Sequence, residues 1–121
     1  MNNKTNILLK LPKNLQSLHE HEEKNHNKSV KHINTYPALK EHLDIVYSSL
    51  NVIFNTRFYK AQTDDELTIQ ALGIRLFNSI VSSLKLLLAG YYQSSVMIQR
   101  DILETGFLLD YFSIYPPKIS D

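Results

Sequence analysis

The stretch from Thr63 to Gly90 decides the fold, and it reads TDDELTIQALGIRLFNSIVSSLKLLLAG. It opens with a capping box, in which Thr63 is the N-cap and the side chain of Glu66 reaches back to the backbone. It closes at Gly90, a residue that favours the conformation needed just after a helix. The roughly 26 residues between them predict a helix about 40 Å long.

Apolar residues cover this predicted helix on two sides. A helix that is apolar on two sides is covered on two sides, so we expect it to be the central element of an all-α fold. No run of residues alternates with the period of two that is typical of a strand. The two apolar lines are Ile69, Leu72, Leu76, Phe77, Ile80, Leu84 and Leu87, and Leu67, Ala71, Ile74, Val81 and Leu88.

Further helices are predicted on both sides of the central one. Before it, apolar residues recur at spacings of three and four from about Pro37 to Ala61, and proline suits a first helical turn. After it, a helix runs from about Tyr91 to Tyr115 and ends because Pro116 and Pro117 cannot donate backbone hydrogen bonds. Two neighbouring apolar lines follow this last helix: Val96, Leu103, Phe107 and Ile114, and Ile98, Ile102, Leu109 and Phe112.

These elements predict a bundle of three to four helices built on a long antiparallel hairpin. Almost no loop separates the last two helices, so they pair as a hairpin that turns at Gly90. We expect a polar arm or weak helix over residues 1–35, the bundle over 36–115 and a short tail over 116–121. The late apolar run from Phe107 to Ile114 needs cover, either from a fourth helix in the arm or from a second subunit.

The hairpin also predicts a register. If the hairpin turns at Gly90, residues whose numbers sum to about 179 lie at one level, which matches Gly73 with Gly106 and Arg75 with Glu104. Residues two apart on a helix point in nearly opposite directions, so only one of these pairs can face inward. We expect the glycines to face each other, with Arg75 and Glu104 pointing apart.

Composition limits the classes of function. The 121 residues correspond to one domain, and a net charge of +1 supplies no field that attracts nucleic acid. No cysteine is present, which excludes disulfides and thiolate metal sites and fits a reducing cytoplasm. The most apolar zone is interrupted by serines and Lys85, so we predict no membrane partner. Abundant Lys and Asn indicate an AT-rich, bacterial coding sequence.

Two patterns resemble functional sites without matching one. His19, His21 and His26 alternate with glutamates, but the spacing is not that of a zinc-protease helix, so we expect a solvated polar segment and no metal or other cofactor. The serines lie outside any nucleophile elbow, and we interpret them as small packing residues. We therefore assign no catalytic residue.

Four charged residues stand inside otherwise apolar helices and are the candidates for a binding site. Arg100 and Glu104 are four residues apart and can pair on one helix surface. Arg75 and Asp101 are the other two. One interpretation is an exposed ion pair, and the other is a polar cluster that faces a groove or a partner. The binding residues we predict are Arg75, Arg100 and Glu104.

Two segments of the hairpin resemble a known superfamily: Leu86–Tyr92, LLLAGYY, and Ile98–Glu104, IQRDILE. A Gly-Tyr pair followed by Arg-x-x-x-Glu is similar to the HEPN-like helical proteins of bacteria, over residues 64–115. The resemblance implies a helical fold and dimerisation. It also implies a fold that continues beyond Pro117, and hence that the chain is a piece of a longer protein.

Many members of that superfamily are ribonucleases or defence toxins whose activity depends on Arg followed after four to six residues by His. The first arginine here is Arg57 and the last histidine is His42, so that motif cannot exist. We therefore expect a non-catalytic helical interaction module, forming a homodimer or binding a protein partner, within a bacterial defence or toxin–antitoxin system. The alternative is a degenerate HEPN-like ribonuclease, or one completed by a partner or a missing segment.

Overall fold

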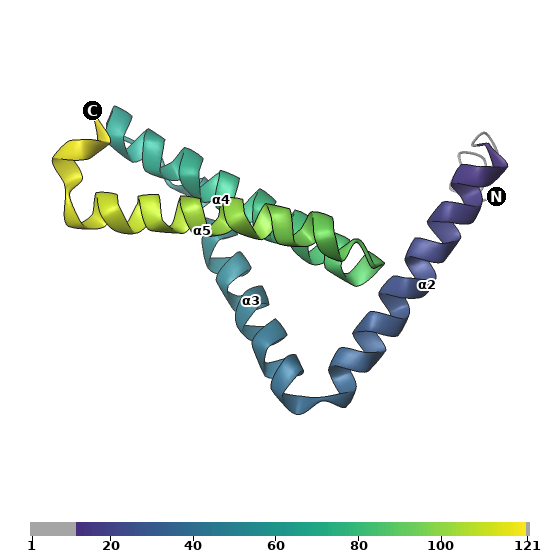
Figure 1. Ribbon diagram of the computed structural model, residues 1–121. Coiled ribbons are helices and arrows are strands. Elements are labelled where there is room, and N and C mark those ends of the chain that lie inside the picture. Colours follow the sequence, from purple (N-terminus) through teal and green to yellow (C-terminus); the bar gives the residue numbers. More distant parts are fainter. Residues whose placement is uncertain (1–11, 121) are drawn as a thin grey trace.

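The computed structural model describes residues 12–120, and in this range it contains four α-helices, two 3₁₀ turns and no strand. The predicted all-α bundle on a long antiparallel hairpin is confirmed. Figure 1 shows α4 and α5 side by side, with α2 and α3 forming a V below them. In chain order the elements are α2 (Lys13–Thr35), α3 (Pro37–Asn55), η1 (Thr56–Phe58), α4 (Asp64–Ala89), α5 (Tyr92–Ile114) and η2 (Pro116–Ile119).

The N-terminus of α4 is capped at the predicted residue. The backbone N–H of Glu66 donates to Oγ1 of Thr63 at 3.2 Å. The Glu66 carboxylate accepts from the backbone N–H of Gln62 at 2.5 Å. In a capping box this second bond goes to the N-cap residue itself, so Glu66 reaches one residue further back than the sequence predicts.

The C-terminus of α4 ends in a Schellman turn. Gly90 has φ 99°. This left-handed conformation is unfavourable for residues with a side chain and is open to glycine. Its N–H donates to the carbonyl of Leu87 at 3.2 Å, and the N–H of Tyr91 donates to the carbonyl of Leu86 at 2.8 Å. These two bonds satisfy carbonyls that the helix leaves open and start α5 directly afterwards.

Small polar residues form the seam between α4 and α5. Ser83 and Ser95 are both buried, and their hydroxyl oxygens lie 2.9 Å apart. The Ser95 hydroxyl also contacts the carbonyl of Ser83 at 2.8 Å. Side chains this small let two helix backbones approach closely, and the hydrogen bonds satisfy the hydroxyls of Ser83 and Ser95. The hydroxyl of Thr105, which is also buried, has no hydrogen-bond partner among the described residues.

The predicted register of α4 against α5 along the hairpin agrees with the structure, but the prediction of which residues face the other helix is wrong. Ser79 on α4 reaches Asp101 on α5, at equal distance from Gly90. A Cβ placed on Gly73 would have Oγ1 of Thr56 as its nearest neighbour, at 3.9 Å, and one on Gly106 would meet nothing within 4 Å. The glycines therefore do not face each other. The line through Ser79 and Ser83 faces α5 instead, and this turns Gly73 toward the end of α3.

α3 begins at Pro37 as predicted but ends six residues before Ala61. The hydroxyl of Thr56 donates to the carbonyl of Ile53 at 2.6 Å, and the chain tightens into η1. The side-chain amide of Gln70 on α4 then donates to the carbonyls of Thr56 and Tyr59, at 3.1 and 2.9 Å. Both carbonyls lie beyond Asn55, the last residue of α3, so Gln70 holds the turn that follows the helix.

α2 is a helix of 23 residues with no buried residue. It meets the turn of the hairpin, where Asn25 donates to the carbonyl of Ala89 and Ser29 donates to the carbonyl of Leu88. The sequence left open whether the arm over 1–35 is helical, and residues 13–35 are. The expectation for residues 1–11 lies outside the described residues.

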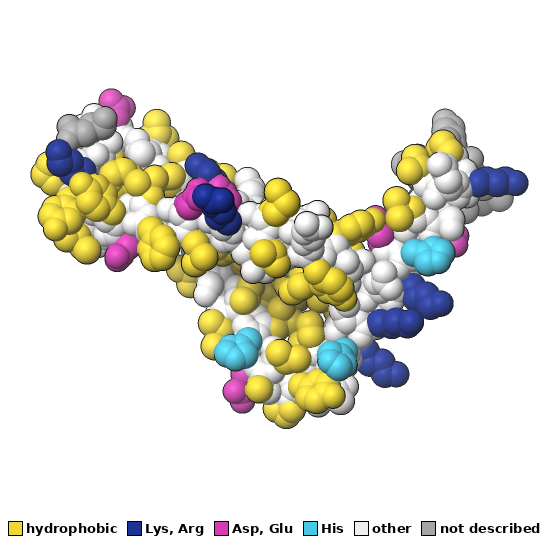
Figure 2. Space-filling model, viewed as in Figure 1, with side chains coloured by type: hydrophobic (Ala, Val, Ile, Leu, Met, Phe, Trp, Pro, Cys, Tyr) yellow, Lys and Arg dark blue, Asp and Glu magenta, His cyan; other side chains and the backbone are white. Residues whose placement is uncertain are grey.

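The single chain leaves much apolar surface uncovered. Its accessible surface is 9681 Å², whereas a folded monomer of 14.0 kDa exposes roughly 6,700 Å². Of the large apolar side chains in residues 12–120, only Leu50 and Leu88 are buried. Figure 2 shows hydrophobic side chains along the hairpin and inside the V.

By length and composition alone, α4 is apolar enough to cross a membrane. The same composition suits the central helix of a bundle, and α4 contacts α2, α3, η1 and α5. Among the helices of residues 12–120, no other one passes this test.

Candidate functional site

The main polar cluster on the hairpin joins α4 to α5. The guanidinium of Arg75 pairs with the carboxylate of Asp101, contacting it through Nη2 and, at 3.4 Å, through Nε. The hydroxyl of Ser79 donates to the same carboxylate at 2.7 Å. The Arg75 side chain is about half exposed and that of Asp101 about one-third, so the cluster borders water.

The cluster shifts the protonation equilibria of both partners. Hydrogen bonds from Arg75 and then from Ser79 lower the pKa of Asp101 below its usual value. The hydrogen bond to Asp101 raises the pKa of Arg75, and the nearby charge of Glu104 adds a small contribution in the same direction. Both changes favour the charged forms, so the pair is ionised at neutral pH.

Arg100 and Glu104 form a separate ion pair on α5. Nε of Arg100 lies 3.0 Å from the Glu104 carboxylate, at the spacing of four residues that the sequence predicts. The side chains are 81% and 61% exposed, which makes this an open surface pair. Exposed pairs of this kind contribute about 0.3–0.5 kcal/mol to stability.

The structure therefore divides the predicted binding residues between two pairs. Arg75 takes Asp101 as its partner, and Arg100 takes Glu104. Each arginine already has a carboxylate, so neither charge is left over for an anionic ligand. Asp101 and Ser79 complete the first pair, although neither is among the three predicted binding residues. Asp101 is one of the four charged candidates in the sequence, whereas Ser79 is not. The signal for Ser79 was its position one turn from both Arg75 and Ser83, a polar line on an otherwise apolar helix.

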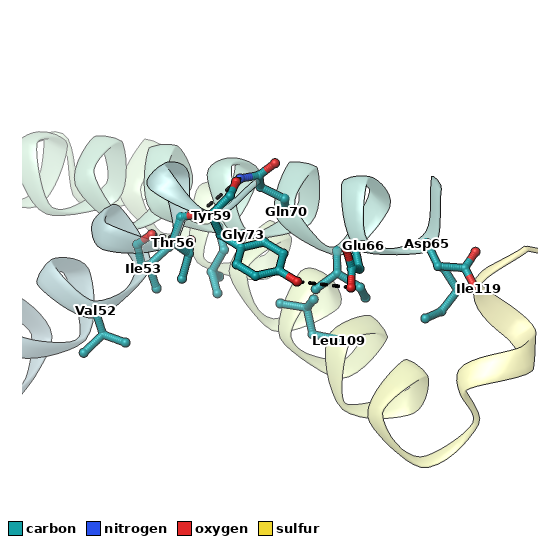
Figure 3. A pocket seen from close by; sticks show the side chains of 12 residues that line it. Val52, Ile53, Thr56, Tyr59, Asp65, Glu66, Gln70, Gly73, Leu109 and Ile119 are labelled. Atoms are coloured by element: carbon teal, nitrogen blue, oxygen red, sulfur yellow. Dashed lines mark hydrogen bonds between the residues drawn. The ribbon is translucent and has the colours of Figure 1, made fainter. Parts of the chain in front are cut away.

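A second feature is an apolar groove of about 470 Å³ where α3, α4 and α5 meet (Figure 3). Its walls come from Val52, Ile53, Ile69, Leu76, Leu109 and Ile119.

The polar groups at the rim of this groove are engaged with one another. The Tyr59 hydroxyl donates to Glu66 at 3.1 Å, and this bond raises the pKa of Tyr59. Asp65 accepts from the hydroxyl of Ser120 at 2.7 Å. The groove therefore offers apolar contact and no convergent set of free polar groups, which a catalytic site would need.

The histidine-rich segment lies on α2. His19, His21 and His26 are spread along a helix that is mostly exposed, and Nδ1 of His21 lies 2.7 Å from the carbonyl of Ser17. In the part of the chain that the structure describes, no three His, Asp or Glu side chains are grouped so as to hold a metal ion.

Comparisons with protein-family models, with curated proteins and with solved structures found no match to this chain.

Proposed function

We propose that this chain is a non-catalytic helical interaction module that completes its core by binding a second copy of itself. The observation that carries this is the accessible surface, which exceeds that of an ordinary monomer of this mass by roughly 3,000 Å². Permanent homodimer interfaces bury about 2,000–5,000 Å² in total, which is of the same order as this excess of total surface.

The polar residues support binding over catalysis. Arg75 and Asp101 neutralise each other, as do Arg100 and Glu104, and the groove beside α3 carries no unengaged polar group at its rim. The resemblance of residues 64–115 to HEPN-like proteins extends the proposal to a bacterial, cytoplasmic defence or toxin–antitoxin system.

Sedimentation of the purified chain tests the assembly. We expect a species of twice the 14.0 kDa of the chain at concentrations on the order of tens of micromolar. A species of single mass at that concentration would contradict the proposal. An RNA cleavage assay tests the alternative: cleavage that is lost in Arg100→Ala would make the chain a ribonuclease, and we expect none.

A further inference from the structure

The outer face of α5 is the most continuous apolar surface left open. Ile98, Ile102 and Leu109 belong to the face that packs on α4. The other apolar line, Val96, Leu103, Phe107 and Ile114, points away from α4, and its members are 61%, 60%, 70% and 61% exposed. We call these four residues the outer stripe. In Figure 2 hydrophobic side chains gather over the hairpin, most densely toward the end where the chain terminates.

Among the helices of residues 12–120, no other one has four apolar residues in line that are each at least 60% exposed. On α3, Ile45 and Val52 are as exposed, but they are a pair rather than a line. Phe54 on the same helix is engaged by the ring of Phe77, at 5.6 Å between centroids, and by the guanidinium of Arg57. The outer stripe spans 19 residues, whose 18 steps rise roughly 27 Å along α5.

The outer stripe is symmetric in position about Thr105. Leu103 and Phe107 lie two residues on either side of it, and Val96 and Ile114 lie nine residues on either side. In an antiparallel pair of identical helices, residues at equal distances from the two-fold axis meet. An axis at the level of Thr105 would therefore set Leu103 against Phe107 and Val96 against Ile114, so that every member of the stripe meets an apolar partner.

We propose that two copies of this chain dimerise through the outer stripe, with their α5 helices antiparallel about a two-fold axis at the level of Thr105. This inference rests on the proposed function and adds to it the face and the direction of pairing. Arg100 and Tyr111 lie on the same edge of the stripe, so each Arg100 comes within one residue of the level of Tyr111 in the second copy. A guanidinium over an aromatic ring keeps its charge at the wet edge of the interface while its stem covers apolar surface.

The absence of natural cysteine makes cross-linking between introduced ones decisive. Chains carrying Leu103→Cys and Phe107→Cys, differently tagged and assembled together, should form a mixed dimer with a short thiol-reactive cross-linker. Val96→Cys with Ile114→Cys should do the same. The control is Val96→Cys with Phe107→Cys, which this register holds about seven residues, or roughly 10 Å, out of level.

The outcomes separate the inference from the proposed function. Linking of Val96→Cys chains to each other would mean parallel helices and overturn the pairing. A dimer in sedimentation with no link at either predicted pair would place the interface elsewhere and leave only the proposed function. A monomer would overturn both.

A charge introduced at the stripe gives a second measurement. Phe107→Arg should weaken dimerisation by more than about tenfold, because Phe107 lies near the centre of the interface. Ile45→Arg, at an equally open position on α3, should leave dimerisation unchanged. Equal loss in both variants, or none in Phe107→Arg, would contradict the inference.

Discussion

The hairpin of α4 and α5 and the pair formed by α2 and α3 are both helical, but different interactions hold them in place. The hairpin buries Ser83, Ser95 and Thr105 in its seam and closes on a Schellman turn. In the α2–α3 pair, only Leu50 of α3 is buried, and no residue of α2 is buried. A helical pattern in the sequence therefore indicates that a helix forms. How firmly that helix is held to the rest of the fold depends on which of its side chains pack against other helices.

α2 is joined to the hairpin by polar contacts near its middle. The hydroxyl of Tyr91 donates to Glu22 at 2.5 Å, and Ser29 donates to the carbonyl of Leu88 at 3.0 Å. Side-chain hydrogen bonds of this kind contribute about 1 kcal/mol each, far less than a packed helix face. We expect the two regions to respond to mutation on correspondingly different scales.

The largest effect should come from overfilling the hairpin seam. Ser83→Leu forces a large side chain between helices that approach closely at Ser95, and should lower the free energy of unfolding by about 3 kcal/mol. Ser82→Leu is the matched control, because Ser82 is exposed and should change stability by less than about 0.5 kcal/mol. Denaturant unfolding at one fixed protein concentration measures both. Similar effects in the two variants would mean that the seam is not closely packed.

A smaller and local effect is expected where α2 meets the hairpin. Ser29→Ala removes the bond to Leu88 and should lower the protection of α2 amides by about 1 kcal/mol in native-state hydrogen exchange, leaving α4 and α5 unchanged. Asn27→Ala, at an exposed position on α2, is the control. In the unmutated chain α2 should be less protected than Leu84 on α4, and equal protection would refute the comparison.

The elements were predictable from the sequence because their signals are local. Thr63 fixes the start of α4 through its side-chain hydroxyl, Gly90 fixes its end through a left-handed backbone conformation, and Pro37 fixes the start of α3. The end of α3 was not predictable, because the turn that follows it is held by Gln70, which donates to the carbonyl of Thr56 from α4. The interpretation of serines as packing residues holds at Ser83, which is buried.

The sequence did not predict how each helix is rotated about its own axis, and hence which of its residues face the neighbouring helix. Both sides of α4 carry enough apolar residues to face α5, so the choice between Gly73 and Arg75 depended on contacts that only the packed hairpin shows. The Arg100–Glu104 pair lies within one helix and was predictable from its spacing. The pair of Arg75 with Asp101 spans two helices and was not.

The smallest effect should come from the charge pair that bridges the hairpin. The pKa of Asp101 is lowered in the folded chain, chiefly by the hydrogen bond from Arg75 and then by that from Ser79. A lowered folded-state pKa stabilises the fold above the unfolded value, which is about 3.9 for Asp, and this stabilisation is lost as the pH falls through the folded value. The Asp101→Asn variant lacks this titration, so its melting temperature should fall less than that of the unmutated chain between about pH 4 and pH 2. Asp110→Asn, an exposed position on the same helix, should keep the steeper acid dependence, because Asp101 is still present. Thermal melts followed by circular dichroism across this range compare the three chains. If Asp101→Asn followed the unmutated chain throughout, the bridge between α4 and α5 would contribute nothing to the hairpin in water, and the seam at Ser83 and Ser95 would hold it alone.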